Sequence, residues 1–203
     1  MNIPSKDDCF RLMCETRMLE NIVAHSLQVC RVGMCLADHL KLQGIDLDGR
    51  LVQAAALLHD ITKTRSFETE ENHALTGGQL LSERGYVEVG NLVRQHVHLD
   101  QYFFQSGPGE VEIINYADKR VLHDRIVSLD KRMDYILDRY GKNPELQQKI
   151  QMLLGKTRAL EKNIFSYLPF PPNDLQRHLT SSDLFSEISN YRKVCSQLTS
   201  RNG

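Results

Sequence analysis

Apolar residues recur along this chain at steps of three and four, which is the spacing of one face of an α-helix. The members of these stripes are Ile22, Val29, Val32 and Leu36, then Val52, Ala55 and Ala56, then Val89 and Leu92, and finally Val111, Ile114, Val121 and Leu122. No convincing run of alternating residues indicates a sheet. The pattern therefore predicts an all-α bundle.

The helices expected from this pattern cover almost the whole chain. They are predicted over about 5–18, 21–40, 48–62, 73–84, 86–98, 110–124, 128–140, 144–168 and 181–198. Ser5, followed by acidic residues, is a suitable cap for the first of them. A polar loop is expected over Lys63–Glu71, and prolines break the chain at Pro169–Pro172.

Several of the apolar stripes carry a histidine or an aspartate where Leu or Val is usual. His25, His59, His96 and Asp118 lie in line with apolar residues, and Asp60 directly follows His59. A further histidine, His73, precedes Gly77 and Leu80. A buried imidazole or carboxylate costs several kcal/mol unless it is paired, hydrogen-bonded or bound to metal. Six such residues on five segments are most simply explained by a shared site for divalent transition metal.

Composition and charge narrow the class of protein. A chain of 203 residues, 25% charged and 41% hydrophobic, is expected to form one enzyme-sized domain. The net charge of −1, with no block of one sign, does not predict binding to nucleic acid or membranes by bulk electrostatics. The longest apolar stretch, Ala54–Leu58, is too short to span a bilayer, and no signal peptide is recognisable.

The five cysteines stand singly in the sequence, and none forms a CxxC pair. We therefore expect neither a disulfide framework nor a thiolate zinc site, but small buried side chains in a reducing, cytoplasmic compartment. The cysteines are Cys9, Cys14, Cys30, Cys35 and Cys195.

The order H…HD…D, with the segments LLHDITK and NYADK, resembles the HD superfamily of metal-dependent phosphohydrolases over about residues 20–125. The resemblance implies an HD-type helical domain over 1–127. Residues 128–203 lie outside the resemblance and are expected to form a helical extension packed on the same domain, which closes the pocket, pairs two subunits or lengthens the bundle. His73 and His96 resemble the subset that binds two metals, such as the bacterial diadenosine tetraphosphate hydrolases and the cyclic-di-nucleotide phosphodiesterases. By that likeness, the first metal is held by His25, His59, Asp60 and Asp118, and the second by Asp60, His73 and His96.

The chain also departs from better-known members of that superfamily. Thr62 replaces the usual glycine of HDIGK, the segment after Asp118 lacks Glu-Pro-x-Arg, and no GYP signature is present. These differences leave the substrate open.

We expect hydrolysis of a nucleotide or another small phosphate ester by a metal-activated water. One or two divalent ions are expected, iron or manganese first, with nickel, cobalt or zinc as alternatives, because the set is rich in histidine. Asp60 and Lys63 are the candidate catalytic residues. The candidate contacts to substrate are Lys63, Arg65, Arg94, His98 and Lys119. Neither a membrane nor a nucleic acid is expected as partner, and a homodimer is left open.

Two other functions fit the same residues. Some HD proteins hold a diiron pair in a six-ligand site and activate oxygen, and the order His, His-Asp, His, His, Asp fits that chemistry equally well. The other is a regulatory module that senses a nucleotide without turnover; an intact ligand set argues against it. His39, His123 and His178 carry no spacing signal and are expected at the surface, and the charged run after Asp118 is expected to be a solvated helix face.

Overall fold

The computed structural model describes residues 1–102, 107–179 and 183–199. This part of the chain contains ten α-helices, one 3-10 helix and one hairpin of two very short strands. The predicted all-α fold is confirmed. Across the same residues, no helix combines the length and the apolar character needed to cross a bilayer.

Six helices make up the first half of the chain. Side-chain caps begin three of them, since Ser5, Asp48 and Asn72 accept hydrogen bonds from backbone N–H groups in the first turns of α1, α3 and α5. The polar loop expected over residues 63–71 is instead the short helix α4. The bounds are α1 Lys6–Glu15, α2 Glu20–Leu42, α3 Gly49–Leu58, α4 Lys63–Thr69, α5 His73–Glu83 and α6 Val87–Val93.

The second half holds four helices and the hairpin. The helix predicted over 110–124 ends at Lys119, and the chain then turns back on itself at His123, whose φ is 56°. Residues 181 and 182 of the last predicted helix lie outside the described part. The bounds are α7 Glu110–Lys119, β1 Val121–Leu122, β2 Arg125–Ile126, α8 Leu129–Tyr140, α9 Pro144–Phe165, the 3-10 helix Pro172–His178, and α10 Leu184–Thr199.

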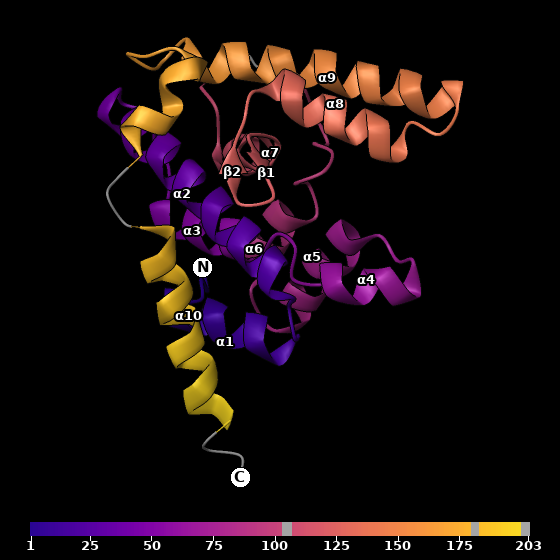
Figure 1. Cartoon of the computed structure of the whole chain (residues 1–203). Helices are drawn as coiled ribbons and strands as arrows, with labels where there is room; N and C mark the ends of the chain where they lie inside the picture. Colours follow the sequence, from indigo (N-terminus) through magenta and orange to yellow (C-terminus); the bar gives the residue numbers. More distant parts are fainter. Residues whose placement is uncertain (103–106, 180–182, 200–203) are drawn as a thin grey trace.

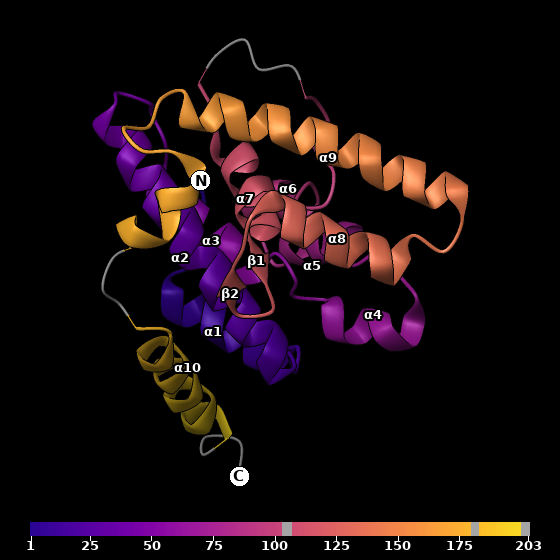
Figure 2. The same cartoon turned by 45° about the horizontal axis from the view of Figure 1, so that its top comes forward.

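Helix α2 forms the centre of the bundle and packs against α3 and α7 (Figure 1). Leu36, Leu58 and Ile114, one from each helix, are fully buried between them. Helices α8 and α9 form an antiparallel hairpin across one side of this core, while α10 lies beside α1 at another side (Figures 1 and 2). The packing of α2 against α3 and α7 therefore determines where the polar residues on their inward faces meet.

Only the first part of the charged run after Asp118 is buried, contrary to the expected solvated face, whereas residues 123–125 are exposed, as expected. Lys119 and Arg120 are only 3% and 4% exposed. The Arg120 guanidinium donates to the carbonyl of Val127 at 2.8 Å and to that of Pro172 at 3.0 Å, and it also contacts the Tyr116 hydroxyl. Backbone carbonyls thus satisfy these cations, and Arg120 connects α7 to the segment that follows α9.

The expectation about cysteines is wrong for one pair. Cys14 and Cys195 form a disulfide that joins the C-terminal end of α1 to α10, across a sequence separation of 181 residues. Cys9, Cys30 and Cys35 are free and buried, as predicted. Burial raises the pKa of the Cys30 thiol to about 12, so this thiol stays protonated.

Candidate metal centre

Six polar residues from separate helices converge at one place in the bundle. They lie in α2, in the turn that follows α3, at the start of α5, in the turn that follows α6, and near the end of α7. All six residues picked out by the sequence are brought together, namely His25, His59, Asp60, His73, His96 and Asp118.

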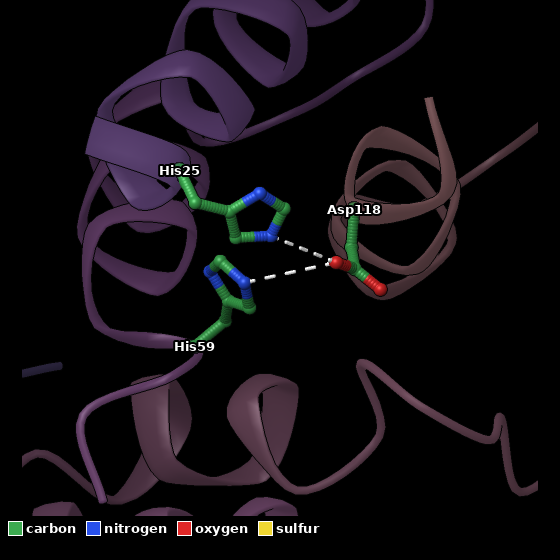
Figure 3. Close-up of side chains that lie close together, drawn as sticks. All are labelled: His25, His59 and Asp118. Carbon is green, nitrogen blue, oxygen red and sulfur yellow. Dashed lines mark hydrogen bonds and ion pairs between the residues drawn. The ribbon is translucent and has the colours of Figure 1, made fainter. Parts of the chain in front are cut away.

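One group of ligand atoms surrounds the carboxylate of Asp118. Its Oδ1 lies 3.1 Å from His25 Nε2 and 3.8 Å from His59 Nε2 (Figure 3). The two rings approach edge to face, with 5.3 Å between their centroids. The three donor atoms lie within 4.8 Å of one another, which is a spacing that one metal ion can bridge.

A second group surrounds the carboxylate of Asp60. Its Oδ1 lies 3.2 Å from His73 Nε2 and 3.5 Å from His96 Nε2, while its Oδ2 lies 3.6 Å from His59 Nε2. The two ring nitrogens of His73 and His96 are themselves 3.2 Å apart. Asp60 therefore faces both groups, with one oxygen toward each.

Backbone carbonyls fix which nitrogen of three rings carries the proton. Nδ1 of His25 lies 2.8 Å from the carbonyl of His123, and Nδ1 of His59 lies 2.8 Å from that of Ala56. Nδ1 of His96 lies 2.7 Å from the carbonyl of the residue three positions earlier. A carbonyl only accepts, so each Nδ1 is the donor, and each Nε2 of a neutral ring presents a lone pair to the centre.

The surroundings of His59 test whether the centre suits a cation. The ring is fully buried, and its Nε2 has no hydrogen-bond partner among the residues that the structure describes. Burial lowers the pKa of His59 to about 4, which keeps the ring neutral. An orphaned buried acceptor beside two carboxylates is costly, and a divalent metal relieves that cost by accepting all of the lone pairs. The residues present therefore fit a divalent metal.

Both carboxylates are held in the charged form. Burial alone would raise the pKa of Asp60, yet the neighbouring His59, His73 and His96 hold it well below its usual range. Burial opposes ionisation of Asp118 in the same way, and its contact with His25 and the charges of Lys119 and Arg132 outweigh it. Both carboxylates can therefore bind a metal ion without first losing a proton.

The predicted substrate contacts divide into two groups. Lys63 and His98 line the cavity beside the centre, and Lys63 Nζ lies 3.4 Å from both ring nitrogens of His73. Arg65 and Arg94 lie outside that lining, where they pair with Glu71 and Asp100. The reason for Arg65 is the helical form of α4, which turns this residue away from Lys63.

Lys119 also lines the cavity, but its ammonium group has other partners. It donates to the carbonyls of His96 at 2.7 Å and Asn115 at 3.1 Å, and it lies 3.6 Å from Asp118 Oδ2. Burial lowers the pKa of Lys119, although Asp118 opposes this effect. Its donors are directed at these oxygens, so Lys119 positions the His96 backbone and Asp118.

Sequence reasoning missed the residues that α8 contributes. The cavity has a volume of about 670 Å³, and Arg132, Tyr135 and Arg139 form part of its wall. Arg132 Nη2 lies 3.7 Å from Asp118 Oδ1. The steps of three and four between these residues mark one helix face, but nothing in the sequence shows that this face meets the metal ligands. His123 is exposed, as expected, but it too lines the cavity.

Fold and site together define an all-helical protein with a buried histidine and carboxylate centre suited to divalent metal. The family model described as HD domain matches residues 22–140. This match covers more than half of the chain, and the chain belongs to the HD domain family. The members of that family are generally metal-dependent hydrolases.

Several curated proteins resemble the chain. A tRNA (cytidine(56)-2'-O)-methyltransferase of Picrophilus torridus is 29% identical over 65% of the chain and 40% of its own length. An uncharacterized protein of Methanocaldococcus jannaschii is 27% identical over 70% of the chain and 91% of its own length. Ribonuclease Y of Petrotoga mobilis is 33% identical over 42% of the chain and 16% of its own length. The first and third matches thus span less than half of these relatives. No solved structure matches the chain.

Proposed function

We propose that this protein is a metal-dependent phosphohydrolase that acts on a nucleotide or another small phosphate ester. The observation that carries the proposal is the orphaned Nε2 of His59, buried among carboxylate and imidazole ligand atoms at the base of an open cavity. Membership of the HD domain family supports it. Two relatives bear names that refer to RNA, which is consistent with a nucleotide-containing substrate.

His25, His59, Asp60 and Asp118 would hold a first metal ion, and Asp60, His73 and His96 a second. This histidine-rich donor set favours iron or manganese over magnesium. When bound, the metal supplies an activated water and neutralises charge on the phosphoryl oxygens.

The cations that remain available lie on both sides of the centre. Lys63 adjoins His73, which belongs to the group around Asp60, whereas Arg132 lies beside Asp118. The Nε atom of Arg132 is buried and finds no hydrogen-bond partner within the described part of the chain. Two cations placed in this way favour an anionic substrate and bind its phosphoryl oxygens, which keeps the ester linkage near the metal ligands.

The test combines metal content with turnover. Protein purified without chelator or affinity nickel is analysed by mass spectrometry, then assayed with nitrophenyl phosphate esters and mononucleotides, with and without oxygen. We expect bound iron or manganese and oxygen-independent hydrolysis, both lost in His59→Gln and kept in His178→Gln, a histidine outside the cavity. Bound metal without hydrolysis of any of these esters would contradict the proposal.

The comparison of assays with and without oxygen also tests a second candidate function, that of a diiron oxygenase. The observation in its favour is the ligand set itself, because four histidines and two carboxylates also suit a pair of redox-active iron ions. Turnover that requires both iron and oxygen would replace the hydrolase proposal with this one. Nucleotide binding without turnover in either arm would favour a sensor.

A further inference from the structure

One face of α8 forms a wall of the cavity that leads away from the metal centre. Its residues follow steps of three, one, three and one, which places them on a single side of the helix. From the first to the last, this face rises about 12 Å, at 1.5 Å per residue. We call it the α8 face, and it consists of Arg132, Tyr135, Ile136, Arg139 and Tyr140.

The α8 face begins at the metal ligands and ends near the turn that joins α8 to α9. At its inner end, Arg132 lies 3.7 Å from Asp118. At its outer end, Tyr140 and Leu146, on either side of that turn, still line the cavity. Figure 2 shows this turn at the far end of the hairpin, away from the core helices. The cavity is therefore longer than a reacting phosphoryl group needs.

Cations and aromatic rings alternate along this face. The Arg132 guanidinium lies 5.8 Å from the centroid of the Tyr135 ring, and that of Arg139 lies 5.8 Å from the Tyr140 ring. Arg139 also donates to the Tyr135 hydroxyl at 3.0 Å. Tyr140 is 49% exposed. Among the described residues, Arg139 forms no ion pair with a carboxylate, so its charge is available to a ligand.

The acidic residues of α8 point the other way. Asp130, Asp134 and Asp138 follow steps of four on the opposite side of the helix, are exposed, and do not line the cavity. Both arginines of α8 therefore lie on the side of the cavity, and its three aspartates lie on the other side together with Lys131. A net charge of −1 for the whole chain does not show this, which is why bulk charge did not predict a polyanionic ligand.

We propose that the α8 face binds a single-stranded oligonucleotide, with phosphates at the two arginines and bases against the two tyrosines. A nucleoside polyphosphate would need its cations clustered, because its phosphates are consecutive. On the α8 face the arginines are two helical turns apart, with the Tyr135 ring between them. Proteins that bind single strands combine cations that follow the phosphate backbone with aromatic rings on which bases stack. We call this arrangement on the α8 face the track.

This inference rests on the proposed function for the reaction, since the bound strand brings its terminal phosphodiester to the centre. Hydrolysis there adds water across one P–O bond. The water oxygen bonds to phosphorus, the bond to the neighbouring sugar oxygen breaks, and that oxygen takes up a proton. The products are a mononucleotide and a strand shortened by one unit.

Binding can be measured without turnover. The metal-free full chain is titrated against fluorescein-labelled RNA and DNA octamers by fluorescence anisotropy, at several salt concentrations. We expect Arg139→Gln and Tyr140→Leu to weaken binding about tenfold each. Arg139→Gln should also reduce the slope of log affinity against log salt by about 0.7, the value for one lost phosphate contact to a single strand. The matched control is Arg177→Gln, an exposed arginine paired with Asp174 outside the cavity, which should change neither quantity.

The RNA and DNA arms identify the source of the strand. Tighter binding of RNA indicates recognition of the 2′-hydroxyl, and equal binding indicates recognition of backbone and bases alone; both support the track. Affinities of Arg139→Gln and Tyr140→Leu equal to that of the unaltered protein would overturn it.

A cleavage arm separates this inference from the proposed function. Manganese-loaded protein is given the octamers and, separately, bis(p-nitrophenyl) phosphate, a small diester that does not reach the outer end of the α8 face. We expect Arg139→Gln to reduce kcat/KM for the octamer about tenfold more than for the small diester. Cleavage of the small diester without binding of octamers would overturn the track and leave the function standing. If octamers bind in a way that depends on Arg139 but neither substrate is cleaved, the proposed function is overturned and the track stands.

Discussion

At the scale of single residues, two helix ends orient the ligand atoms. His59 follows the end of α3 and His96 follows the end of α6, and each ring bonds through Nδ1 to the carbonyl three residues earlier. In both cases a buried carbonyl in the last turn of the helix accepts from Nδ1, and this bond aims Nε2 at the centre. Two ligands are thus positioned by backbone alone.

Asp60 is the residue on which the whole centre depends, because it is the carboxylate that faces both groups of ligands. We expect Asp60→Ala to reduce the metal content per chain to background and to abolish turnover. Helical content should be retained, because the change also removes a buried charge that needs partners. Mass spectrometry and circular dichroism measure the two effects. Asp134→Ala, an exposed residue on the opposite side of α8, serves as control, and full metal content in Asp60→Ala would contradict the assignment.

At the scale of elements, the sequence predicted helices wherever an apolar stripe exists. It failed at α4, which has no buried residue, so no stripe marks it. It failed again after Lys119, where the chain forms a hairpin instead of continuing as helix. The partners that allow Arg120 to be buried are carbonyls of Val127 and Pro172. These contacts depend on tertiary packing, and local periodicity cannot predict them.

Parts of the site were predictable for the same reason, because they lie on apolar stripes. His25, His59, His96 and Asp118 interrupt apolar stripes, so the pattern predicts that they lie on the inward faces of their helices. Arg132 and Arg139 do not interrupt an apolar stripe, because α8 carries charges on two sides and has only two buried residues, Leu129 and Met133. Only the docking of the hairpin beside Asp118 shows which side faces the cavity.

Helices α5 and α6 cross so closely that side chains are excluded from the contact. A Cβ added at Gly78 would lie 2.7 Å from the carbonyl oxygen of Gly90 and 2.8 Å from Cβ of Arg94. We expect Gly78→Ala to lower the free energy of unfolding by about 1–3 kcal/mol, because the backbones must separate. The change should also weaken metal binding, since α5 begins at His73 and α6 leads to His96.

The matched control for this prediction is Gly155→Ala, in the exposed part of α9. A Cβ there meets nothing within 4 Å, so the change should raise the free energy of unfolding by about 0.5–1 kcal/mol, the helix preference of Ala over Gly. Urea unfolding of both variants measures the difference. Equal stability of the two alanine variants would show that the crossing tolerates a methyl group.

At the scale of the whole molecule, contacts between distant parts of the chain hold α10 against the first helices. Glu187 pairs with Lys6 at 2.5 Å, and Arg192 pairs with Glu20 at 3.0 Å. The Arg192–Glu20 pair is exposed, and such pairs typically contribute less than about 1 kcal/mol, whereas the Lys6–Glu187 pair is partly buried. The Cys14–Cys195 disulfide is therefore the strongest single constraint between the two ends.

Removal of that disulfide should destabilise the protein without affecting the metal centre, because neither cysteine lines the cavity. We expect the double variant Cys14→Ser, Cys195→Ser to lose about 2–4 kcal/mol of unfolding free energy relative to the oxidised protein, since the bond limits the unfolded chain. Dithiothreitol should erase this difference by destabilising only the unaltered protein.

Alkylation of denatured protein directly counts the cysteines that are not in a disulfide. Three cysteines should react before reduction and all five after it. Five reactive cysteines before reduction would show that the two sulfurs are not bonded, and the ends of the chain would then be held by the ion pairs and by the packing of α10 on α1 and α2.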